Sequence, residues 1–328
     1  MKTLLAFTIA TLYGLFLRFV FAFYGSIMEI ISISMVVAAP LAIGYLTVTL
    51  MGLKKVTNHA AAFFWPWLTC LMLLIVTIML AVEGAICWVI IFPFFAVGAG
   101  FGGLIAYGVL RAREQRSKEE NNDVIDDFDR KDGLQVSLIL MFPIFLGFLE
   151  QDRLLAPAEY RITRQMIVPA EIPAVWSAIT SSTSLNPEEN QSFFTSFFGL
   201  PRHQRTELDT LAVGGRRTAY YERGLYFEET ITQLDTHRTM RVSIKADPGN
   251  VPPTVLDEHI VIGGRHFKAL EDTYVLTPRT DGTCLLELSG RISINTPFNW
   301  YSGLWARWVL SDLFDDQLRQ IGRRATNR

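Results

Sequence analysis

The sequence has little cysteine, and the few cysteines are scattered. Three occur in 328 residues: Cys70 and Cys87 lie in apolar runs, and Cys284 lies in a strand-like segment. No two of them form a CxxC pair, so the pattern indicates neither a disulfide framework nor a cysteine-based metal site. We interpret the three thiols as core residues.

An excess of positive charge is also absent. Lys and Arg number 30 and Asp and Glu number 32, which gives a formal net charge of −2. Nucleic-acid binding requires a clustered basic surface, so we expect no nucleic-acid partner. His259 and His266 have no third ligand at a metal-like spacing, and no serine or cysteine has a recognisable nucleophile context. We therefore expect no metal or other cofactor and assign no catalytic residue.

Charge of either sign is scarce in the first third of the chain. Residues 1–110 hold only a handful of charges, although the whole chain is 19% charged and 50% hydrophobic, with a mean hydropathy of +0.26. Apolar runs long enough to span a membrane extend to about Phe23 and then over residues 30–53, 60–82 and 84–110. Residues 1–110 are therefore predicted to form four transmembrane helices, an α-helical bundle in a lipid bilayer.

A shorter apolar run covers residues 133–149. About seventeen helical residues reach roughly 25 Å, the short end of what spans a hydrocarbon core. Pro143 in the middle is tolerable in lipid when neighbouring helices satisfy the freed carbonyl. We predict a fifth transmembrane helix over residues 133–150, after a charged cytoplasmic linker over residues 111–132. A re-entrant or interfacial segment is the alternative.

Lysine and arginine are concentrated in alternate loops. Lys54 and Lys55 lie in one loop and others lie within residues 111–131, whereas the turns near Tyr24 and Glu83 carry none. Because basic loops stay in the cytoplasm, we expect a multi-pass integral protein of the cytoplasmic membrane. The remainder of the chain then lies on the extracytoplasmic side if the fifth run crosses, and in the cytoplasm if it does not.

Small residues recur at fixed spacing in the fourth run. Gly98, Gly100 and Gly103 satisfy GxGxxG, but they lie in an apolar run with no preceding strand, so a dinucleotide site is not indicated. Gly98 and Gly102 are four residues apart, as are Ala99 and Gly103. This spacing is typical of membrane helices that approach closely, and we predict close helix packing here.

From Tyr160 onward the pattern becomes that of one water-soluble α+β domain, residues 151–328. Alternation in YRITRQMIV ends at Pro169, and EIPAVWSAIT then begins a helix. A long helix from about Pro297 to Arg323 ends the domain, with Thr296 placed to cap it. Between them we predict an irregular helical segment over residues 184–200 and strands over residues 202–208, 216–222, 225–233, 239–245, 255–262, 272–277 and 283–294.

This order of elements resembles the START-like superfamily, also called SRPBCC or the polyketide cyclase/dehydrase family. The resemblance is carried by IVPAEIPAVWSAIT, GLYFEETITQLD, LDEHIVIGGRHFKALEDTYVLTP and FNWYSGLWARWVLSDLFDDQLRQIGRR, and it leaves the membrane half unexplained. It implies a helix-grip fold, in which a curved antiparallel sheet around a long C-terminal helix encloses a deep apolar cavity. Members bind or transport lipids and other hydrophobic molecules, and some cyclise or dehydrate polyketides.

Alternation along the strands indicates which side chains face the terminal helix. On that helix we place the apolar stripe Tyr301, Leu304, Trp305 and Trp308 inward, and Arg307, Asp312 and Asp316 outward. An ordinary filled core would show the same stripe. The side chains that we expect to line a ligand cavity are Phe227, Glu229, Met240, Val242, Glu258, Tyr274, Leu288, Trp305 and Trp308.

Three of these side chains are polar among apolar neighbours: Glu229, Glu258 and Tyr274. A buried carboxylate needs a partner or stays protonated, and a raised pKa suits a general acid or base. The alternatives are that Glu229 pairs with an arginine at the cavity rim and that Tyr274 places its hydroxyl at the edge.

Together these patterns predict a membrane-anchored protein whose SRPBCC-like domain binds a membrane lipid or another hydrophobic small molecule. They do not identify protein partners, which stay unknown. One alternative is a polyketide cyclase/dehydratase-like enzyme that uses the inward carboxylates and Tyr274. Another is a membrane transporter or sensor, in which the helical bundle is the active part and the soluble domain senses a ligand.

Overall fold

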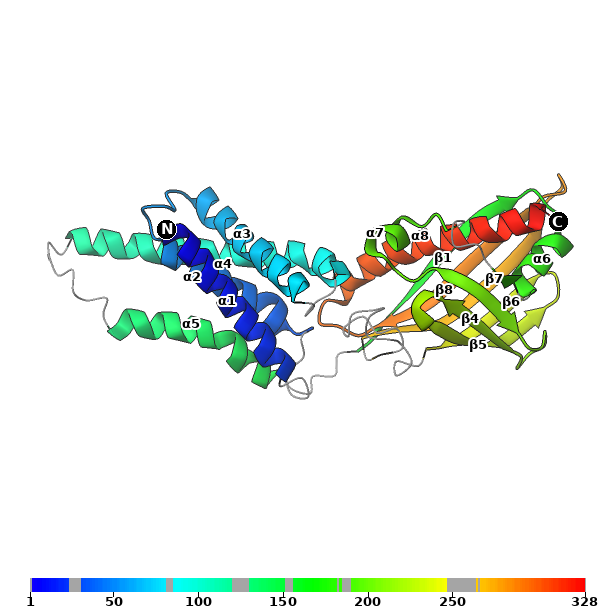
Figure 1. Cartoon of the computed structure of the whole chain (residues 1–328), viewed down its shortest axis with the longest axis horizontal. Helices are drawn as coiled ribbons and strands as arrows, with labels where there is room; N and C mark the ends of the chain where they lie inside the picture. Colours follow the sequence, from blue (N-terminus) through cyan, green and yellow to red (C-terminus); the bar gives the residue numbers. More distant parts are fainter. Residues whose placement is uncertain are drawn as a thin grey trace. The chain divides into compact units, whose positions relative to one another are not determined.

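The chain folds into two compact units, Met1–Leu154 and Leu155–Arg328, which Figure 1 shows in sequence colours. The structure is a computed structural model. It describes residues 2–23, 31–80, 85–119, 130–150, 156–181, 183–184, 190–246, 264 and 266–327.

The first unit is helical throughout its described elements. Four of its helical segments, over residues 3–23, 34–51, 59–79 and 88–116, are long and apolar enough to cross a membrane. They coincide with the four predicted runs. The apolar part described in the fifth helix, Val136–Leu149, is shorter, so its crossing stays a prediction. The elements are α1 (Lys2–Phe23), a π-helix (Ser34–Ala38), α2 (Ala39–Met51), α3 (His59–Met79), α4 (Ala85–Glu119) and α5 (Arg130–Leu149).

Helix α4 packs closely on α2 and α3 through its glycines. A Cβ atom added to Gly102 would overlap the backbone carbonyl of Leu41 in α2, and one on Gly103 would overlap the carbonyl of Ala62 in α3. These close approaches confirm the predicted role of the small residues. They also place the GxGxxG sequence inside a membrane-length helix and not in a phosphate-binding turn.

Helix α5 belongs to the same unit. The Tyr13 hydroxyl in α1 donates to the Leu140 carbonyl over 2.6 Å. At the end of α5, a Glu150 carboxylate oxygen accepts from the Ser34 backbone N–H over 2.9 Å. Ser34 is the first residue of a membrane-length segment, so the chain leaves the helical unit level with the end of that segment.

The second unit is an eight-stranded antiparallel sheet with a long C-terminal helix running along it, an arrangement consistent with a helix-grip fold (Figure 1). Its strand order is β1-β8-β7-β6-β5-β4-β3-β2. The elements are β1 (Ala158–Val168), α6 (Ile172–Thr180), β2 (Thr183–Ser184), α7 (Phe193–Phe198), β3 (His203–Leu208), β4 (Arg216–Tyr221), a 3₁₀ turn (Glu222–Gly224), β5 (Tyr226–Asp235), β6 (Thr239–Lys245), β7 (Phe267–Pro278), β8 (Cys284–Ile294) and α8 (Asn299–Thr326).

The core of this unit lies between the sheet and α8. Alternate residues of the strands point to one face, and the predicted inward residues Ile231, Met240, Val242, Leu286 and Leu288 are indeed fully buried. They pack with apolar side chains from the second half of α8, namely Phe314, Leu318 and Ile321.

Two local predictions differ from the structure. Thr296 does not cap the last helix: Phe298 holds the cap position, and Asn299 turns its side-chain oxygen back to accept from the Thr296 backbone N–H over 2.7 Å. Strand β7 begins at Phe267, five residues earlier than predicted. The predicted strand over residues 255–262, with Glu258 and His259, lies outside the described residues.

The predicted inward stripe of the terminal helix is wrong. Leu304 and Trp308 are exposed, whereas Asp316 is buried. The physical reason is a close approach to β1 at Gly303: a Cβ atom there would collide with the ring of Tyr160, whose hydroxyl donates to the Asn299 carbonyl over 2.7 Å. The smallest residue, and not the most apolar one, therefore faces the sheet at this turn.

Candidate functional site: a buried polar cluster beside helix α8

An arginine and a carboxylate lie side by side within the sheet domain. Arg217 on β4 is directly opposite Glu229 on β5, and both point to the face that α8 covers. Their side chains are only 7% and 10% exposed, and Arg217 Nη1 lies 3.3 Å from Glu229 Oε2. Within the described part of the chain, Arg217 Nε and Nη1 and Glu229 Oε2 make no hydrogen bond of good geometry. The pair is thus desolvated and retains unused donor capacity.

Strand β7 contributes Tyr274 and Asp272 to the same region. The guanidinium carbon of Arg217 lies 5.6 Å from the Tyr274 ring centroid, within the range of a cation–π interaction. Gln317 of α8 donates to the Tyr274 hydroxyl over 2.6 Å. Sheet and helix therefore meet at this hydroxyl.

Burial shifts the protonation of these groups. It raises the pKa of Asp272 to about 7, and the Glu229 charge adds to the rise while Arg217 opposes it. Burial also raises the pKa of Glu229, again against the attraction of Arg217. For Arg217, burial lowers the pKa, but the surrounding negative charges, Glu229 first, more than offset it and leave the pKa raised. The cluster accordingly holds a constant positive charge on Arg217 beside Asp272, a carboxyl group whose pKa lies near 7.

His203 on β3 borders the cluster. Burial, with the nearby Arg217 and Arg324 charges, lowers the pKa of His203 to about 4. Its ring Nε2 lies 2.9 Å from the Thr206 hydroxyl, and the ring stacks on Tyr221 with centroids 4.9 Å apart. The imidazole is therefore neutral and takes part in hydrogen bonding at ordinary pH.

A small pocket opens beside this cluster. Its volume of about 10 Å³ is room for about one water molecule, so the pocket holds no lipid-sized ligand as it stands. Several lining side chains are long and flexible, and Arg217 lines it from the sheet. The lining residues are Ile179, Ser181, His203, Thr206, Arg217, Gln317, Gln320, Ile321 and Arg324.

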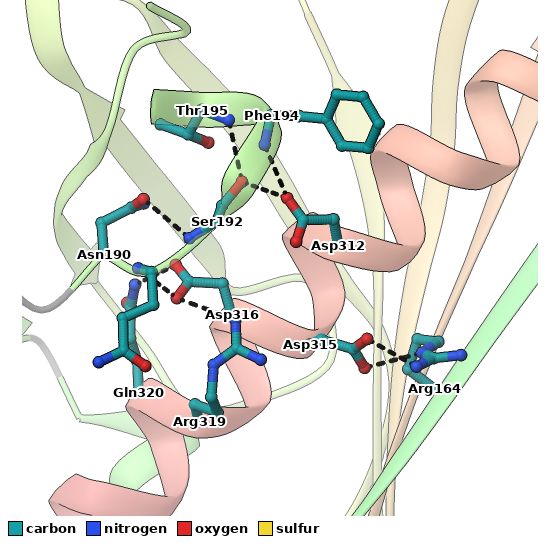
Figure 2. Close-up of polar contacts among 11 residues, drawn as sticks. Arg164, Asn190, Ser192, Phe194, Thr195, Asp312, Asp315, Asp316, Arg319 and Gln320 are labelled. Carbon is teal, nitrogen blue, oxygen red and sulfur yellow. Dashed lines mark hydrogen bonds and ion pairs between the residues drawn. The ribbon is translucent and has the colours of Figure 1, made fainter. Parts of the chain in front are cut away.

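Carboxylates on α8 hold the helix and the α7 segment in place (Figure 2). Asp312 accepts from the Ser192 hydroxyl over 2.7 Å and from the Phe194 backbone N–H over 3.0 Å. Asp316 accepts from the Gln191 backbone N–H and from the Gln320 side chain, each over 2.7 Å. The predicted outward placement is therefore wrong for Asp316, which is buried and satisfies a backbone donor that precedes α7, whereas Asp312 is only partly buried. Gln320, held by Asp316, is thereby positioned at the pocket.

The predicted cavity residues do not lie together. Glu229 and Tyr274 lie in the polar cluster, and Glu229 pairs with arginine in the interior and not at a rim. Phe227 packs in a small separate cluster around Leu225. Glu258 lies outside the described residues. Met240, Val242 and Leu288 are core residues, Trp305 is partly buried and Trp308 is exposed.

Sequence reasoning missed Arg217, Asp272, His203 and Gln317. The period of two along a strand contains a signal for two of them. Arg217 shares the inward face of its strand with Ala219, and Asp272 shares that of its strand with Tyr274. Strand register, which brings Arg217 opposite Glu229, has no comparable signal in a single sequence.

Comparisons with known proteins concern the second unit. No family model and no curated protein match the sequence. Among solved structures, truncated norcoclaurine synthase from Thalictrum flavum is 10% identical and covers 52% of this chain and 94% of its own, with a TM-score of 0.33. Protein MLL2253 from Mesorhizobium loti is 13% identical and covers 51% and 98%, with a TM-score of 0.32. Ara h 8.0201 is 10% identical and covers 52% and 100%, with a TM-score of 0.30.

These neighbours have Bet v 1-like, SRPBCC-type folds and match about half of the chain. At such identities and scores, the similarity carries no assignment of a ligand or a reaction to this protein.

Proposed function

We propose that this is a membrane-anchored protein whose helix-grip domain binds an amphipathic small molecule, with the polar end of that molecule at Arg217. The observation that carries the proposal is the remaining donor capacity of Arg217: a guanidinium 7% exposed, beside a pocket, whose Nε makes no hydrogen bond among the described residues and whose Nη1 has only the 3.3 Å ion pair with Glu229. A carboxylate or phosphate is the group that a guanidinium fork binds best.

The apolar end of such a molecule needs room that the pocket does not have as it stands. Gln317, Gln320 and Arg324 line the pocket from α8 with flexible side chains, and rotation of these side chains away from Arg217 enlarges it without moving the sheet. The four membrane-length helices supply the anchor and a local source of lipid-like molecules. Ligand entry in this proposal is coupled to loss of the Gln317–Tyr274 hydrogen bond.

The proposal can be tested with dansyl-labelled undecanoic acid and its uncharged methyl ester as probes. The full chain in lipid nanodiscs is titrated with each probe, and the signal of empty nanodiscs is subtracted. We expect saturable binding of the acid, weaker binding of the ester, and a loss of roughly tenfold or more in acid affinity for Arg217→Met, because a hydrogen bond to a charged group contributes about 1.5–3 kcal/mol.

Arg164→Met is the matched control, since Arg164 pairs with Asp315 on the exposed side of α8. It should bind the acid as the unmodified chain does. Arg217→Lys keeps the charge but loses the fork, and should bind with intermediate affinity, which separates ligand recognition from misfolding. Equal acid binding by all four proteins would refute a role for Arg217.

The enzyme alternative has one observation in its favour. Asp272 has a pKa of about 7, a value suited to general acid or base catalysis, and it lies near the Tyr274 hydroxyl region. An acid–base reaction at this site requires that Asp272→Asn abolishes turnover of a bound substrate while leaving acid-probe binding intact. Binding without turnover in the unmodified chain favours the carrier function.

A further inference from the structure

The first half of helix α8 carries an exposed apolar stripe. Leu304 and Trp308 are 55% and 67% exposed, and Trp300, one turn earlier, is exposed as well. These residues are four apart, so they lie one above another on one side of the helix. A row of large apolar side chains facing outward is unusual for a domain that folds in water.

Helix α7 extends the stripe. The row Trp300, Leu304, Trp308 leads at the next position to Asp312, which holds the first residues of α7 through Ser192 and the Phe194 backbone (Figure 2). On α7, Phe193 and Phe197 are 62% and 63% exposed, and their rings stack with centroids 5.5 Å apart. We call Leu304, Trp308, Phe193 and Phe197 the aromatic surface.

Charge is distributed unevenly along α8. Residues 299–311 contain no Asp or Glu, and their one charged residue is Arg307, whereas residues 312–326 contain three aspartates and three arginines. Helix α7, FFTSFF, has no charge at all. Helix α7 and residues 299–311 of α8 therefore carry no negative charge, and the acid between them, Asp312, is hydrogen-bonded to Ser192 and the Phe194 backbone. This distribution suits contact with an anionic surface.

A short stretch of chain links the start of α8 to the end of α5. The side-chain amide of Asn299, at the start of α8, donates to the Ala156 carbonyl over 3.3 Å. Ala156 follows Glu150 by six residues, a span of at most about 22 Å when extended. Glu150 in turn binds the first residue of the membrane-length segment Ser34–Met51.

From these observations we infer that the aromatic surface docks into the headgroup–acyl boundary of the bilayer that holds the helical unit. Tryptophan and phenylalanine favour this boundary, where their rings are buried among acyl chains and polar groups remain hydrated. The inference rests on the membrane anchoring proposed above and is independent of what the polar cluster binds.

The test uses the full chain in phosphatidylcholine–phosphatidylglycerol vesicles, with an NBD fluorophore on Trp308→Cys. Cys87→Ala removes one native thiol, and Cys70 and Cys284 are buried. A doxyl label near the headgroup end of the acyl chains should quench the fluorophore at 308, and aqueous iodide should not. The control is Val213→Cys, which is 66% exposed on the turn between β3 and β4 and should show the reverse.

A second variant separates docking from a local property of the label. With NBD on Phe197→Cys, the charge in Leu304→Asp should lower the ratio of docked to undocked protein about tenfold, the change that about 1.4 kcal/mol of lost docking free energy produces. Doxyl quenching should fall with the docked fraction, while Leu304→Phe should retain it. Equal quenching at 308 and 213 would overturn the proposal. So would protection of 308 from both quenchers, because a protein segment or a second copy would then cover the surface.

Discussion

The two units differ in one feature of their interiors. In the helical unit, α2, α3 and α4 approach until glycines meet backbone carbonyls, as Gly102 meets Leu41. In the sheet domain, the face covered by α8 includes an ion pair, Arg217–Glu229, and a carboxyl group with a pKa near 7. Close packing in lipid depends on shape, whereas a buried ion pair often stabilises no more than apolar residues of similar volume. The burial of charged groups in the polar cluster of the sheet domain is therefore not explained by a gain in stability alone.

The largest expected effect concerns the shape-dependent interior. Gly102→Leu places a side chain against the Leu41 carbonyl, and since this neighbour is backbone, it cannot rotate away. We expect a cost well above the roughly 1–3 kcal/mol typical of overpacking, seen as loss of a monodisperse full-length protein in detergent. Gly108→Leu on the same helix is the control, because a Cβ atom there meets nothing within 4 Å. Equal behaviour of the two variants would show that α4 does not pack through this face.

The polar interior should respond next most strongly. Arg217→Met leaves Glu229 buried without its partner and should destabilise the sheet domain by about 3–5 kcal/mol. Arg217→Met with Glu229→Leu removes both charges and should recover most of that loss. Arg164→Met breaks an exposed pair and should cost about 0–1 kcal/mol.

Hydrogen exchange of the β4 and β5 amides in the full chain measures these differences within one unit, which a single unfolding midpoint for a two-unit protein does not. If the double variant exchanges as fast as Arg217→Met alone, the loss comes from packing of the arginine stem and not from an unpaired charge.

Part of this comparison could be predicted from the sequence. Long apolar runs located the helices of the first unit, and the spacing of Gly98, Ala99, Gly102 and Gly103 predicted their packing. Alternation located the buried faces of β5, β6 and β8. These features depend on local periodicity, which a single sequence displays.

The rest depends on contacts between distant residues. Hydrophobicity alone predicts the inward side of α8, yet Gly303 and Asp316 are buried while Trp308 is exposed. Gly303 is required by the ring of Tyr160, and Asp316 by the Gln191 backbone. Neither partner is near α8 in sequence. The predicted inward side of α8 is wrong because the rotation of this helix is fixed by the close approach at Gly303 and by a backbone donor to Asp316. The burial of apolar area does not fix it.

The stability of the sheet domain should depend on pH through two titrating groups, Asp272 and His203, whose contributions have opposite signs and intermediate size. Asp272 has a pKa of about 7 in the folded protein against 3.8 unfolded, so between these values the folded state holds the extra proton and stability falls as pH rises. His203 has a pKa of about 4 against 6.5, so the unfolded state holds the extra proton and stability rises with pH. Within their common window the two contributions partly cancel.

Single substitutions should separate the two contributions. Asp272→Asn should leave a stability that rises from about pH 4 to 6.5, and His203→Gln one that falls from about pH 4 to 7, while the unmodified domain changes less than either. Hydrogen exchange of the β7 amides, corrected for the intrinsic pH dependence of exchange, is the measurement. Identical slopes in all three proteins would mean that neither group titrates differently on folding.

The last prediction has the smallest effect on the fold. It concerns the side of the membrane on which the end of α4 and the sheet domain lie. Arg116 at the end of α4 and Asn327 after α8 are both exposed, so Arg116→Cys and Asn327→Cys, each with Cys87→Ala, should leave both units folded. If α5 crosses the membrane, the basic residues after α4 stay in the cytoplasm and the sheet domain lies outside. A membrane-impermeant thiol reagent added to intact cells should then modify position 327 and spare position 116, while both react after lysis. Protection of both in intact cells would place the sheet domain in the cytoplasm, with α5 as a re-entrant or interfacial helix and the aromatic surface directed at the inner leaflet.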